Sequence, residues 1–426
     1  MKNRKKMKNA EQMKHSVINR KNCRLCGSGD LNKFMRFEKI PFFDEVVTDD
    51  KRGKEFSYPM ELYFCHNCCS VQTQHDVNLL DYYKSYQYVA SNSNFMHHYM
   101  DALVNYCQRH LGLKKGDKVI EVGAADGHLL SLFERVGARS LGFEAAENLC
   151  MLAKEKKVNV INALFTRETL RLIPEDFKKT QFFVLLHTFD HLYDPAPFLK
   201  TVCEVLDPKT GVLLLEVHDL SDIYIKRETA LFGHEHATYL HYGSMNRFLN
   251  RHGLRIIDFN FLDKSICRGS SMLVAATPMG SDLLESENLA LFENSKLDEF
   301  ETFLGFQEMV SRSFSELRCY IEEGKAQGKR FAGYGGWGRG VTTLAMARLD
   351  KHHLEFVADG NEKLHGCFTP VTGIQIKAPN AIRRDTVDEV IIFNYAYIRE
   401  ICELLNEFIK DGGKVISVID LLKNGK

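Results

Sequence analysis

The chain has 426 residues, of which 44% are hydrophobic, so it is long enough for two or three domains with cores of their own. Its 56 Lys and Arg residues are balanced by 56 Asp and Glu residues, which argues against a nucleic-acid-binding protein. The sequence lacks the run of about 18 apolar residues that a membrane span requires, so we expect neither a nucleic acid nor a membrane as partner.

The first residues, 1–22, are rich in Lys and lack the apolar stretch of a signal peptide. We expect them to form a flexible, solvated tail. Of the 12 cysteines, several crowd the first 69 residues and the others are scattered singly. Scattered cysteines without a secretory signal suit a reducing cytosol, so a cytoplasmic protein with free thiols is expected.

Four of the early cysteines form two C-x-x-C pairs, in "CRLC" and "CHNC". They are Cys23, Cys26, Cys65 and Cys68. Each pair can place two thiolates on one tetrahedral Zn²⁺, and together they complete a closed, structural Cys₄ site. The sequence therefore predicts a zinc-binding domain over residues 23–75. Two alternatives stay open, because the pairs could be redox dithiols and because Cys69 or His66 could replace a ligand.

Residues 116–149 have the pattern of a βαβ unit. Val119–Val122 is a short apolar run typical of a buried strand, and a small-residue turn, Gly123–Gly127, leads into a helix with an apolar face. A second strand ends at Glu144, whose carboxylate can accept hydrogen bonds from both hydroxyls of a ribose. A nucleoside-binding α/β domain is therefore predicted over residues 76–280.

The turn of this unit differs from a dinucleotide site. Glu121 and Asp126 flank it, and two carboxylates disfavour a pyrophosphate, whereas a sulfonium cofactor with an amino group fits. The segment resembles the motif of class I S-adenosylmethionine (AdoMet) methyltransferases. The resemblance implies that Glu121 or Asp126 organises the amino-acid end of AdoMet and that Glu144 binds its ribose, beside Gly123 and Gly127. A nucleotide-binding domain of another class is the alternative.

Five apolar stretches continue the sheet, the last two as a hairpin: "NVINA", "FFVLLHTFDHL", "GVLLLEVHD", "LRIIDFNFL" and "SSMLVAAT". In open α/β sheets the ligand lies beyond the carboxyl ends of the strands. Six of the 17 histidines follow the fourth and fifth strands at this edge, which favours a site over scattered surface residues. They are His187, His191, His218, His234, His236 and His241.

Three of these histidines lie in "FGHEHATYLH", residues 232–241. A zinc protease of the His-Glu-x-x-His type is excluded, because its two ligands lie one helical turn apart and here the histidines flank the glutamate. An imidazole beside a methyl donor can instead take a proton from the acceptor as general base. If the segment is extended, Glu235 and His236 point to opposite sides, and another residue orients the base.

An acidic, helical stretch over residues 283–326 is expected to lead into a second Rossmann-like unit, within a C-terminal domain of residues 281–426. A G-x-G-x-x-G pattern begins at Gly333, and Asp359 ends the next predicted strand. Alone, this pattern predicts an NAD-dependent oxidoreductase, although glycines at a helix N-terminus suit any phosphate. Trp337, the single tryptophan, either stacks on a base or packs.

The order of these parts resembles the NDP-sugar C-methyltransferases, three-domain enzymes that build branched-chain deoxysugars. The matching pieces lie between residues 23 and 420 and are "CRLCGS", "YPMELYFCHNC", "YQYVASNS", "EVGAADGHLL", "HTFDHL", "HEHATYL" and "YGGWGRGVTTL". Members methylate a carbon beside a keto group on a nucleotide-linked sugar, after a histidine removes a proton and leaves an enolate.

The resemblance implies an α/β protein with a small N-terminal zinc-binding domain, a class I AdoMet methyltransferase Rossmann-like domain and a C-terminal Rossmann-like α/β domain. It implies AdoMet and structural Zn²⁺ as cofactors and a nucleotide-sugar or similar small molecule as acceptor, in a monomer or small homo-oligomer. His236 matches the base, Glu235 its neighbour and His191 the histidine after strand four. The other expected AdoMet contacts are Tyr88, Ser91, Ser93 and His187. The expected acceptor contacts are Tyr86, Arg268, Gly335, Trp337 and Arg339, the last pairing with a diphosphate.

The sequence also departs from the family pattern. Gly233 stands where the family loop commonly has a tyrosine that assists catalysis, and the Gly-Gly-Ser-Leu-Arg segment reads "CRGSSML" with Arg268 shifted. The predicted function is AdoMet-dependent C-methylation of a keto-sugar nucleotide, in deoxysugar or surface-glycan biosynthesis. The alternatives are O- or N-methylation of a related sugar or small molecule, an NAD-dependent oxidoreductase, and a non-catalytic zinc scaffold.

Overall fold

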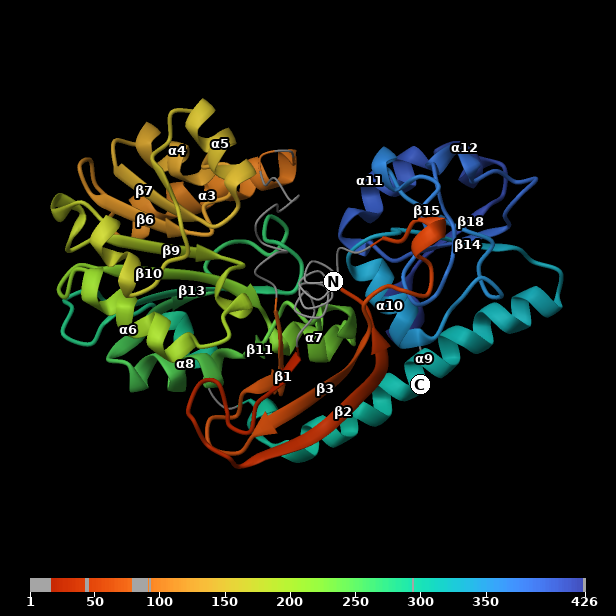
Figure 1. The fold of residues 1–426 in the computed structure, drawn as a ribbon, viewed down its shortest axis with the longest axis horizontal. Helices are drawn as coiled ribbons and strands as arrows, with labels where there is room; N and C mark the ends of the chain where they lie inside the picture. Colours follow the sequence, from red (N-terminus) through yellow and green to blue (C-terminus); the bar gives the residue numbers. More distant parts are fainter. Residues whose placement is uncertain (1–16, 43–45, 79–90, 92, 293–294, 424–426) are drawn as a thin grey trace, which may run out of the picture. The chain divides into compact units, whose positions relative to one another are not determined.

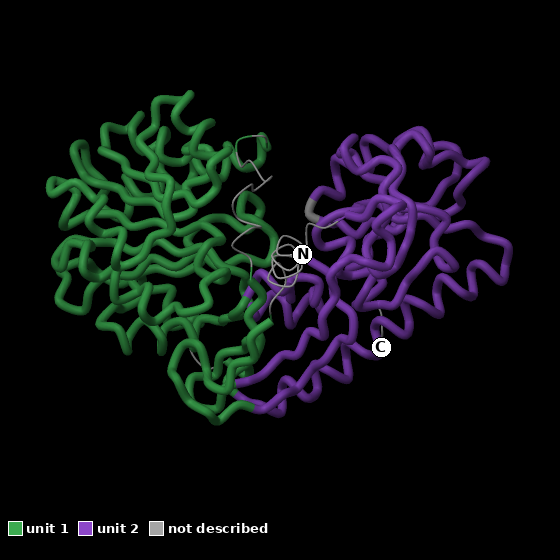
Figure 2. Tube along the Cα trace, in the orientation of Figure 1, with its two compact units in different colours: residues 1–31, 65–219, 237–298 green, residues 32–64, 220–236, 299–426 purple. Residues whose placement is uncertain are grey.

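The computed structural model describes residues 17–42, 46–78, 91, 93–292 and 295–423 (Figure 1). The chain divides into two compact units, each assembled from separate stretches (Figure 2). Unit 1 consists of residues 1–31, 65–219 and 237–298, and unit 2 of residues 32–64, 220–236 and 299–426. The boundaries of the three domains predicted from the sequence stay predictions.

The largest sheet of unit 1 has seven strands in the order β12-β13-β10-β9-β6-β7-β8. β13 is antiparallel to both of its neighbours, and the other pairs are parallel. The strands are β6 (Lys118–Val122), β7 (Arg139–Glu144), β8 (Val160–Asn162), β9 (Phe182–Leu186), β10 (Val212–His218), β12 (Leu254–Phe259) and β13 (Ser271–Pro278). The order reverses between β6 and β9, which is where ligands bind in such sheets. The predicted strands and the closing hairpin are confirmed.

Alternate side chains of these strands pack on opposite faces. Val119 belongs to the core formed with α3 (Asn94–His110) and α4 (His128–Arg135). Its neighbour Ile120 belongs to the core formed with α6 (Pro195–Val205) and α8 (Tyr242–Arg251). This period of two follows from the pleat of a strand, and it explains why strands covered on both faces have continuous apolar sequences.

Short strands surround the cysteine pairs. In unit 1, β1 (Val17–Asn19) pairs with β5 (His75–Val77), and β4 (Val71–Thr73) pairs with β11 (Thr238–Tyr239), both antiparallel. The longer neighbouring strands β2 (Leu31–Ile40) and β3 (Tyr58–Cys65) contribute most of their residues to unit 2. Because β3 ends at Cys65 and β4 begins at Val71, the second C-x-x-C pair starts on the last residue of β3 and continues into the connection between the strands.

The main sheet of unit 2 has five parallel strands in the order β16-β15-β14-β17-β18. They are β14 (Phe331–Tyr334), β15 (Val357–Ala358), β16 (Ile376–Lys377), β17 (Glu389–Ile392) and β18 (Lys414–Ser417). The helices are α7 (Leu220–Lys226), α9 (Phe300–Ala326), α10 (Arg339–Ala347), α11 (Ile398–Leu404), α12 (Asn406–Lys410) and α13 (Val418–Lys423). The order reverses between β14 and β17, so the glycine-rich turn after β14 lies at the expected ligand position.

The helix that precedes this sheet is shorter than the sequence suggested. Helical structure was expected over residues 283–326, but α9 begins at Phe300. The described residues before it contain only the 3₁₀ turns η7 (Glu287–Phe292) and η8 (Lys296–Asp298). Leu284 and Leu291 are 90% and 80% exposed, and only single leucines, Leu289 in η7 and Leu297 in η8, are buried in these turns. Among the described residues, no helix is both long and apolar enough to cross a membrane.

We expect Gly340→Ala to destabilise unit 2. A Cβ at Gly340 would lie 1.8 Å from the carbonyl oxygen of Gly335, so α10 would have to move away from the turn. Overpacking of this kind costs about 1–3 kcal/mol. Gly305→Ala is the control, because an added Cβ on this exposed turn of α9 meets nothing within 4 Å, and it should stabilise by roughly 0.5–1 kcal/mol. Urea unfolding followed by circular dichroism measures both, and a Gly340→Ala protein as stable as wild type would contradict the close approach.

Candidate active site and metal centre

Four cysteine thiols converge in unit 1. The Sγ atoms of Cys23 and Cys68 lie 3.6 Å apart, those of Cys26 and Cys65 lie 3.5 Å apart, and all four lie within 4.8 Å of one another. Thiolates about 2.3 Å from a tetrahedral Zn²⁺ lie about 3.7 Å apart, so the spacing fits this ion. The neighbouring Cys23 raises the pKa of Cys65 to about 12, and a cation is therefore needed before all four can be thiolates.

The glycine-bearing turn of unit 1 connects β6 to α4. Gly123 and Gly127 both have positive φ, 75° and 73°, which favours glycine. A Cβ at Gly123 would lie 2.3 Å from Oγ1 of Thr188, so glycine allows the turn to approach the residues after β9. At the end of β7, Glu144 accepts a hydrogen bond from the backbone N–H of Ala125 at 2.9 Å. The structure thus brings the predicted ribose acid to the turn.

Glu121 is the most deeply buried acid beside this turn. Burial raises its pKa well above the usual value, and the nearby carboxylates of Glu144 and Asp126 add to the effect. Its Oε2 atom has no hydrogen-bond partner among the described residues. A buried carboxylate in these surroundings favours a cationic ligand, and AdoMet carries both a sulfonium and an ammonium group. The residues at the turn therefore fit AdoMet.

Asp126 is paired, unlike Glu121. Its carboxylate accepts hydrogen bonds from the hydroxyl of Ser91 and from the ammonium of Lys156. Burial opposes ionisation, but Lys156 and Ser91 lower the pKa of Asp126 below its usual value. Lys156 directly follows α5 (Glu147–Glu155), and no sequence pattern pointed to it. Ser91, predicted to contact AdoMet, is thus placed beside an acid of the turn.

The other predicted contacts of unit 1 are less closely tied to the turn. The Ser93 hydroxyl caps α3 by accepting from the backbone N–H of Met96 at 3.4 Å. His191 ends the 3₁₀ turn η5 (Phe189–His191) and is partly buried. Tyr86 and Tyr88 lie outside the described residues.

The His-Glu-His loop belongs to unit 2 and forms a turn. The backbone N–H of His236 donates to the carbonyl of Gly233 at 3.3 Å, so the extended conformation considered from the sequence is not adopted. The side chain of His236 lies 3.1 Å, through Nδ1, from the carbonyl oxygen of Leu231. A carbonyl can only accept, so Nδ1 carries the proton and Nε2 the lone pair. Glu235 and His236 are both buried.

His234 is held by an aromatic cluster of unit 2. Its Nε2–H donates to the carbonyl of Ile40 at 2.9 Å. Phe42, Phe56 and Tyr58 meet its ring edge-on, with centroids 5.5–6.3 Å away. Residues almost 200 positions apart thus hold this imidazole in the core, which indicates a packing role.

His241 has a structural partner as well. It caps α8 through reciprocal hydrogen bonds with Ser244. Its Nε2 lies 2.9 Å from a carboxylate oxygen of Asp298, and this contact lowers the pKa of Asp298 below its usual value. The histidines between residues 187 and 241 therefore do not all serve one site.

Two histidines and two acids meet at the carboxyl ends of β9 and β10. Nδ1 of His218 lies 2.6 Å from Oδ2 of Asp190. Nε2 of His187 lies 3.2 Å from Oε1 of Glu216 and 3.0 Å from the hydroxyl of Ser271. The sequence analysis identified both histidines but not Asp190 and Glu216. The only feature of the sequence that could have indicated these acids is their position in or just after adjacent strands.

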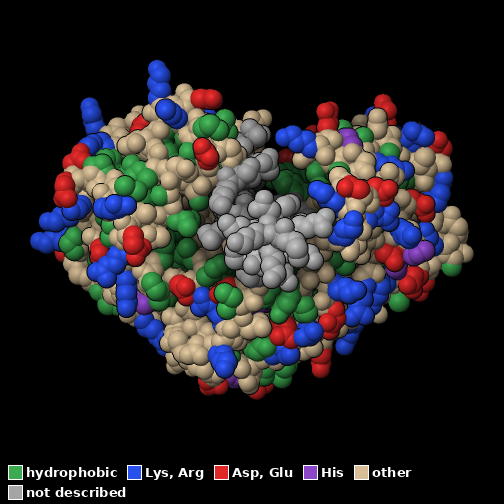
Figure 3. Space-filling model, viewed as in Figure 1, with side chains coloured by type: hydrophobic (Ala, Val, Ile, Leu, Met, Phe, Trp, Pro, Cys, Tyr) green, Lys and Arg blue, Asp and Glu red, His purple; other side chains and the backbone are tan. Residues whose placement is uncertain are grey.

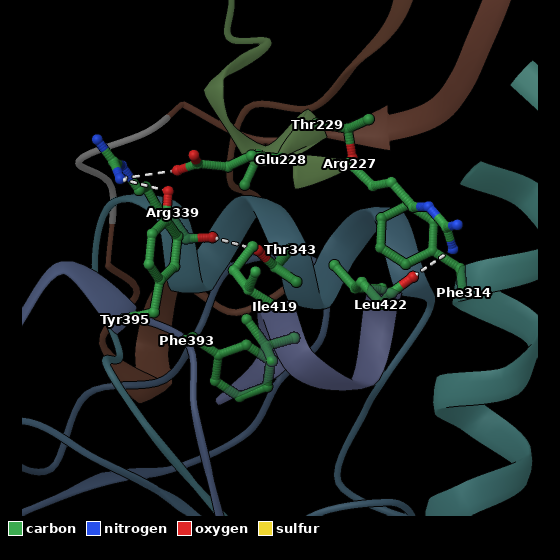
Figure 4. A pocket seen from close by; sticks show the side chains of 12 residues that line it. Arg227, Glu228, Thr229, Phe314, Arg339, Thr343, Phe393, Tyr395, Ile419 and Leu422 are labelled. Carbon is green, nitrogen blue, oxygen red and sulfur yellow. Dashed lines mark hydrogen bonds and ion pairs between the residues drawn. The ribbon is translucent and has the colours of Figure 1, made fainter. Parts of the chain in front are cut away.

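In unit 2, Arg339 follows the glycine-rich turn and is engaged by side chains. Its guanidinium pairs with Glu228 at 2.7 Å and donates to the hydroxyl of Tyr395 at 3.0 Å (Figure 4). The cavity beside this group has a volume of about 10 Å³, room for about one water molecule. Asp359, after β15, accepts from the N–H of Gly336 at 2.9 Å and so closes the turn. Trp337 is half-buried.

Family models match three successive parts of the chain. A zinc binding domain matches residues 23–83, a methyltransferase domain matches residues 93–258, and a C-methyltransferase C-terminal domain matches residues 269–419. C-methyltransferase NovU of Streptomyces niveus is 28% identical over 399 residues, which cover 92% of this chain and 94% of NovU. Together these matches support the C-methyltransferase family that the sequence motifs indicated. The chain is a class I AdoMet-dependent methyltransferase, and its cofactors are AdoMet and Zn²⁺, as the sequence predicted.

Solved structures resemble part of this methyltransferase. Magnesium protoporphyrin IX methyltransferase (ChlM) from Synechocystis PCC 6803 is 16% identical and covers 46% of this chain and 90% of its own, with a TM-score of 0.35. A SAM-dependent methyltransferase from Archaeoglobus fulgidus is also 16% identical and covers 42% and 93%, with a TM-score of 0.33.

We expect one zinc per chain, and Cys65→Ser should abolish its retention, because three thiolates cannot close the tetrahedral site. Cys69→Ser is the matched control, since Cys69 and His66 lie outside the cluster of four. Elemental analysis of the purified proteins gives the stoichiometry. Zinc that persists in Cys65→Ser but disappears in Cys69→Ser would mean that the ligand set is wrong.

Glu121→Gln should weaken AdoMet binding by about tenfold or more, the equivalent of one pKa unit. In the free protein the raised pKa of Glu121 favours its neutral form, and a bound cation lowers that pKa. Wild-type binding should therefore release a proton and strengthen as pH rises towards the raised pKa, whereas Glu121→Gln should lose both effects.

The same substitution should change the pH dependence of stability. A carboxyl whose pKa is raised by folding stabilises the protein below its unfolded pKa and loses this contribution as pH rises. Glu121→Gln should thus be more stable than wild type at high pH. Calorimetry in buffers of different ionisation enthalpy counts the protons, with the exposed Glu147→Gln as control. Equal proton release in both variants would contradict this assignment.

Proposed function

We propose that this enzyme transfers the methyl group of AdoMet to a carbon beside a keto group on a nucleotide-linked sugar. The C-terminal domain match over residues 269–419 and the near full-length match to NovU support C-methylation. The keto-sugar acceptor is inferred from the motifs that resemble NDP-sugar C-methyltransferases. Such a product would serve deoxysugar or surface-glycan biosynthesis.

The hydrogen bond of His236 is the observation that carries the proposed mechanism. Because Nδ1–H donates to Leu231, the basic lone pair belongs to Nε2, and the tautomer is fixed by the backbone. The side chain is 6% exposed, so water competes little for this base. A positioned neutral imidazole is suited to removing a proton at physiological pH.

In the proposed reaction, Nε2 of His236 takes a proton from the carbon beside the keto group. The electrons of that C–H bond move toward the keto oxygen, which gives an enolate. When bound, AdoMet supplies an electrophilic methyl group. The enolate carbon then forms the new carbon–carbon bond as the methyl–sulfur bond breaks, its electron pair stays on the departing neutral thioether, and the keto group is restored. We assign to Glu235 the role of stabilising the imidazolium of His236. We assign to His191 the role of stabilising the enolate oxygen.

Gly233 lies directly against this base and its neighbouring acid. A Cβ at Gly233 would lie 3.0 Å from Oε2 of Glu235 and 3.7 Å from Nδ1 of His236. A side chain at this position, such as the tyrosine common in the family, would therefore contact the catalytic pair directly. Here a proton relay has to come from elsewhere, and Tyr86 and Tyr88 are the candidates from the sequence.

The nucleotide of the acceptor is assigned to the strand-order reversal of unit 2, at Gly335, Trp337 and Arg339. Since Arg339 is paired with Glu228, a diphosphate would have to replace this carboxylate. Because the diphosphate would replace one anion with another, the positive charge of the guanidinium would stay paired before and after binding. Arg268, whose charge acts on Glu216, remains assigned to the sugar.

His236→Ala should lower turnover by ~10²–10⁴-fold, the usual contribution of general base catalysis, with AdoMet affinity nearly unchanged. The assay uses nucleotide-linked keto-sugars with AdoMet and detects the methylated product by mass spectrometry. In D₂O without AdoMet, wild type should exchange the hydrogen beside the keto group, and His236→Ala should not.

His234→Ala is the matched control. Loss of its aromatic contacts should lower stability, while the folded fraction keeps most of its turnover. Product NMR then locates the new methyl group. Methyl on oxygen or nitrogen would favour the O- or N-methyltransferase alternative, and full activity of His236→Ala would rule out the assigned base.

A further inference from the structure

A second group of side chains in unit 1 has the composition of a metal site. His187, Asp190 and His218 each offer one ligand atom, and these atoms lie within 4.8 Å of one another. In the described part of the chain, the four cysteines form the one other group that meets this criterion. Two members follow β9 and the third ends β10, so adjacent parallel strands fix their positions.

The imidazole of His187 is oriented as a ligand would be. Its Nε2 lies against the carboxylate of Glu216, at 3.2 Å, and the hydroxyl of Ser271, at 3.0 Å. The negative charge of a carboxylate this close favours the proton on Nε2, which leaves the lone pair of the neutral ring on Nδ1. That lone pair lies 4.0 Å from Oδ2 of Asp190, too far for a hydrogen bond. Metal-binding histidines usually have a carboxylate beside their other ring nitrogen, as His187 has Glu216 at 3.2 Å.

The backbone of His187 adds an independent observation. Its φ is +47°, a left-handed conformation that non-glycine residues seldom adopt. Such positions are strained and cluster where side chains are held for function. The N–H of His187 donates to the carbonyl of Glu216 at 2.8 Å, so pairing with β10 maintains this conformation.

We propose that His187, Asp190 and His218 bind a divalent first-row transition cation, Fe²⁺, Co²⁺ or Zn²⁺, at a site separate from the cysteine zinc. Two imidazoles and one carboxylate suit these cations. Ligand atoms about 2.1 Å from one cation lie about 3–4 Å apart. The 4.0 Å spacing of His187 and Asp190 fits, and the 2.6 Å spacing of His218 and Asp190 must widen. The cation replaces the Nδ1 proton of His218, which moves to Nε2.

The site lies next to the cofactor turn. Thr188 directly follows His187, and its hydroxyl occupies the space beside Gly123. A cation with three protein ligands keeps open positions, and an acceptor oxygen bound there would be polarised. This role rests on the proposed function, but cation binding itself does not depend on it.

The test is a titration of the zinc-loaded full-length chain with Co²⁺. We expect one cobalt per chain in addition to one retained zinc, with visible absorption bands but no thiolate-to-cobalt charge-transfer band. Asp190→Asn and His187→Asn should each weaken cobalt binding about tenfold or more. Asparagine preserves the size of Asp190 and tolerates the left-handed backbone of residue 187. His110→Asn, at the exposed end of α3, is the control and should bind cobalt as wild type does.

Zinc content and circular dichroism establish that each variant is folded. Absence of cobalt binding in wild type, or equal binding in Asp190→Asn, would overturn the site. So would a cobalt spectrum with thiolate character and loss of zinc. If Asp190→Asn changes only the pH–rate profile, the group is an acid–base pair and not a metal site. Failure of every keto-sugar as acceptor would remove the proposed function and leave the cobalt result unaffected.

Discussion

Burial of carboxylates at the carboxyl edge of the unit 1 sheet is the constraint on which the cofactor site depends. A buried acid must be hydrogen-bonded, paired with a cation or neutral. Glu144 accepts hydrogen bonds from backbone N–H groups, and Asp126 is paired with Lys156. Burial raises the pKa of Glu121, which favours its neutral form. Each acid is thus stabilised in a different way. Glu121 is the one whose protonation state changes when a positively charged cofactor binds.

The parts of the fold governed by local pattern could be predicted from the sequence. The β6 strand, the glycine turn and the acid ending β7 follow one another within about 30 residues, and their order constrains a βαβ unit. The closing hairpin also involves neighbours in sequence, β12 and β13. The four cysteines were recognisable because C-x-x-C spacing reflects the geometry of one metal ion.

Features that depend on contacts between distant residues could not be predicted. Asp190 meets His218 across 28 positions, and His234 meets Ile40 across 194. Nothing in "FGHEHATYLH" distinguishes the packed His234 from His236, because the aromatic cluster and the turn appear only after folding. The start of α9 was misjudged for another reason, since the acidic composition before it resembles a helix surface, whereas the buried Leu289 and Leu297 lie in short 3₁₀ turns.

The chain passes between the two units after residues 31, 64, 219, 236 and 298. During synthesis, β2, β3 and the His-Glu-His loop therefore leave the ribosome long before the sheet of unit 2, which begins at Phe331. Unit 1 likewise lacks β13 until residue 278 has been made. Long sequence separations slow folding and leave apolar surface exposed meanwhile. Both units therefore lack strands until late in translation. Neither unit can fold to completion as one contiguous segment of the chain.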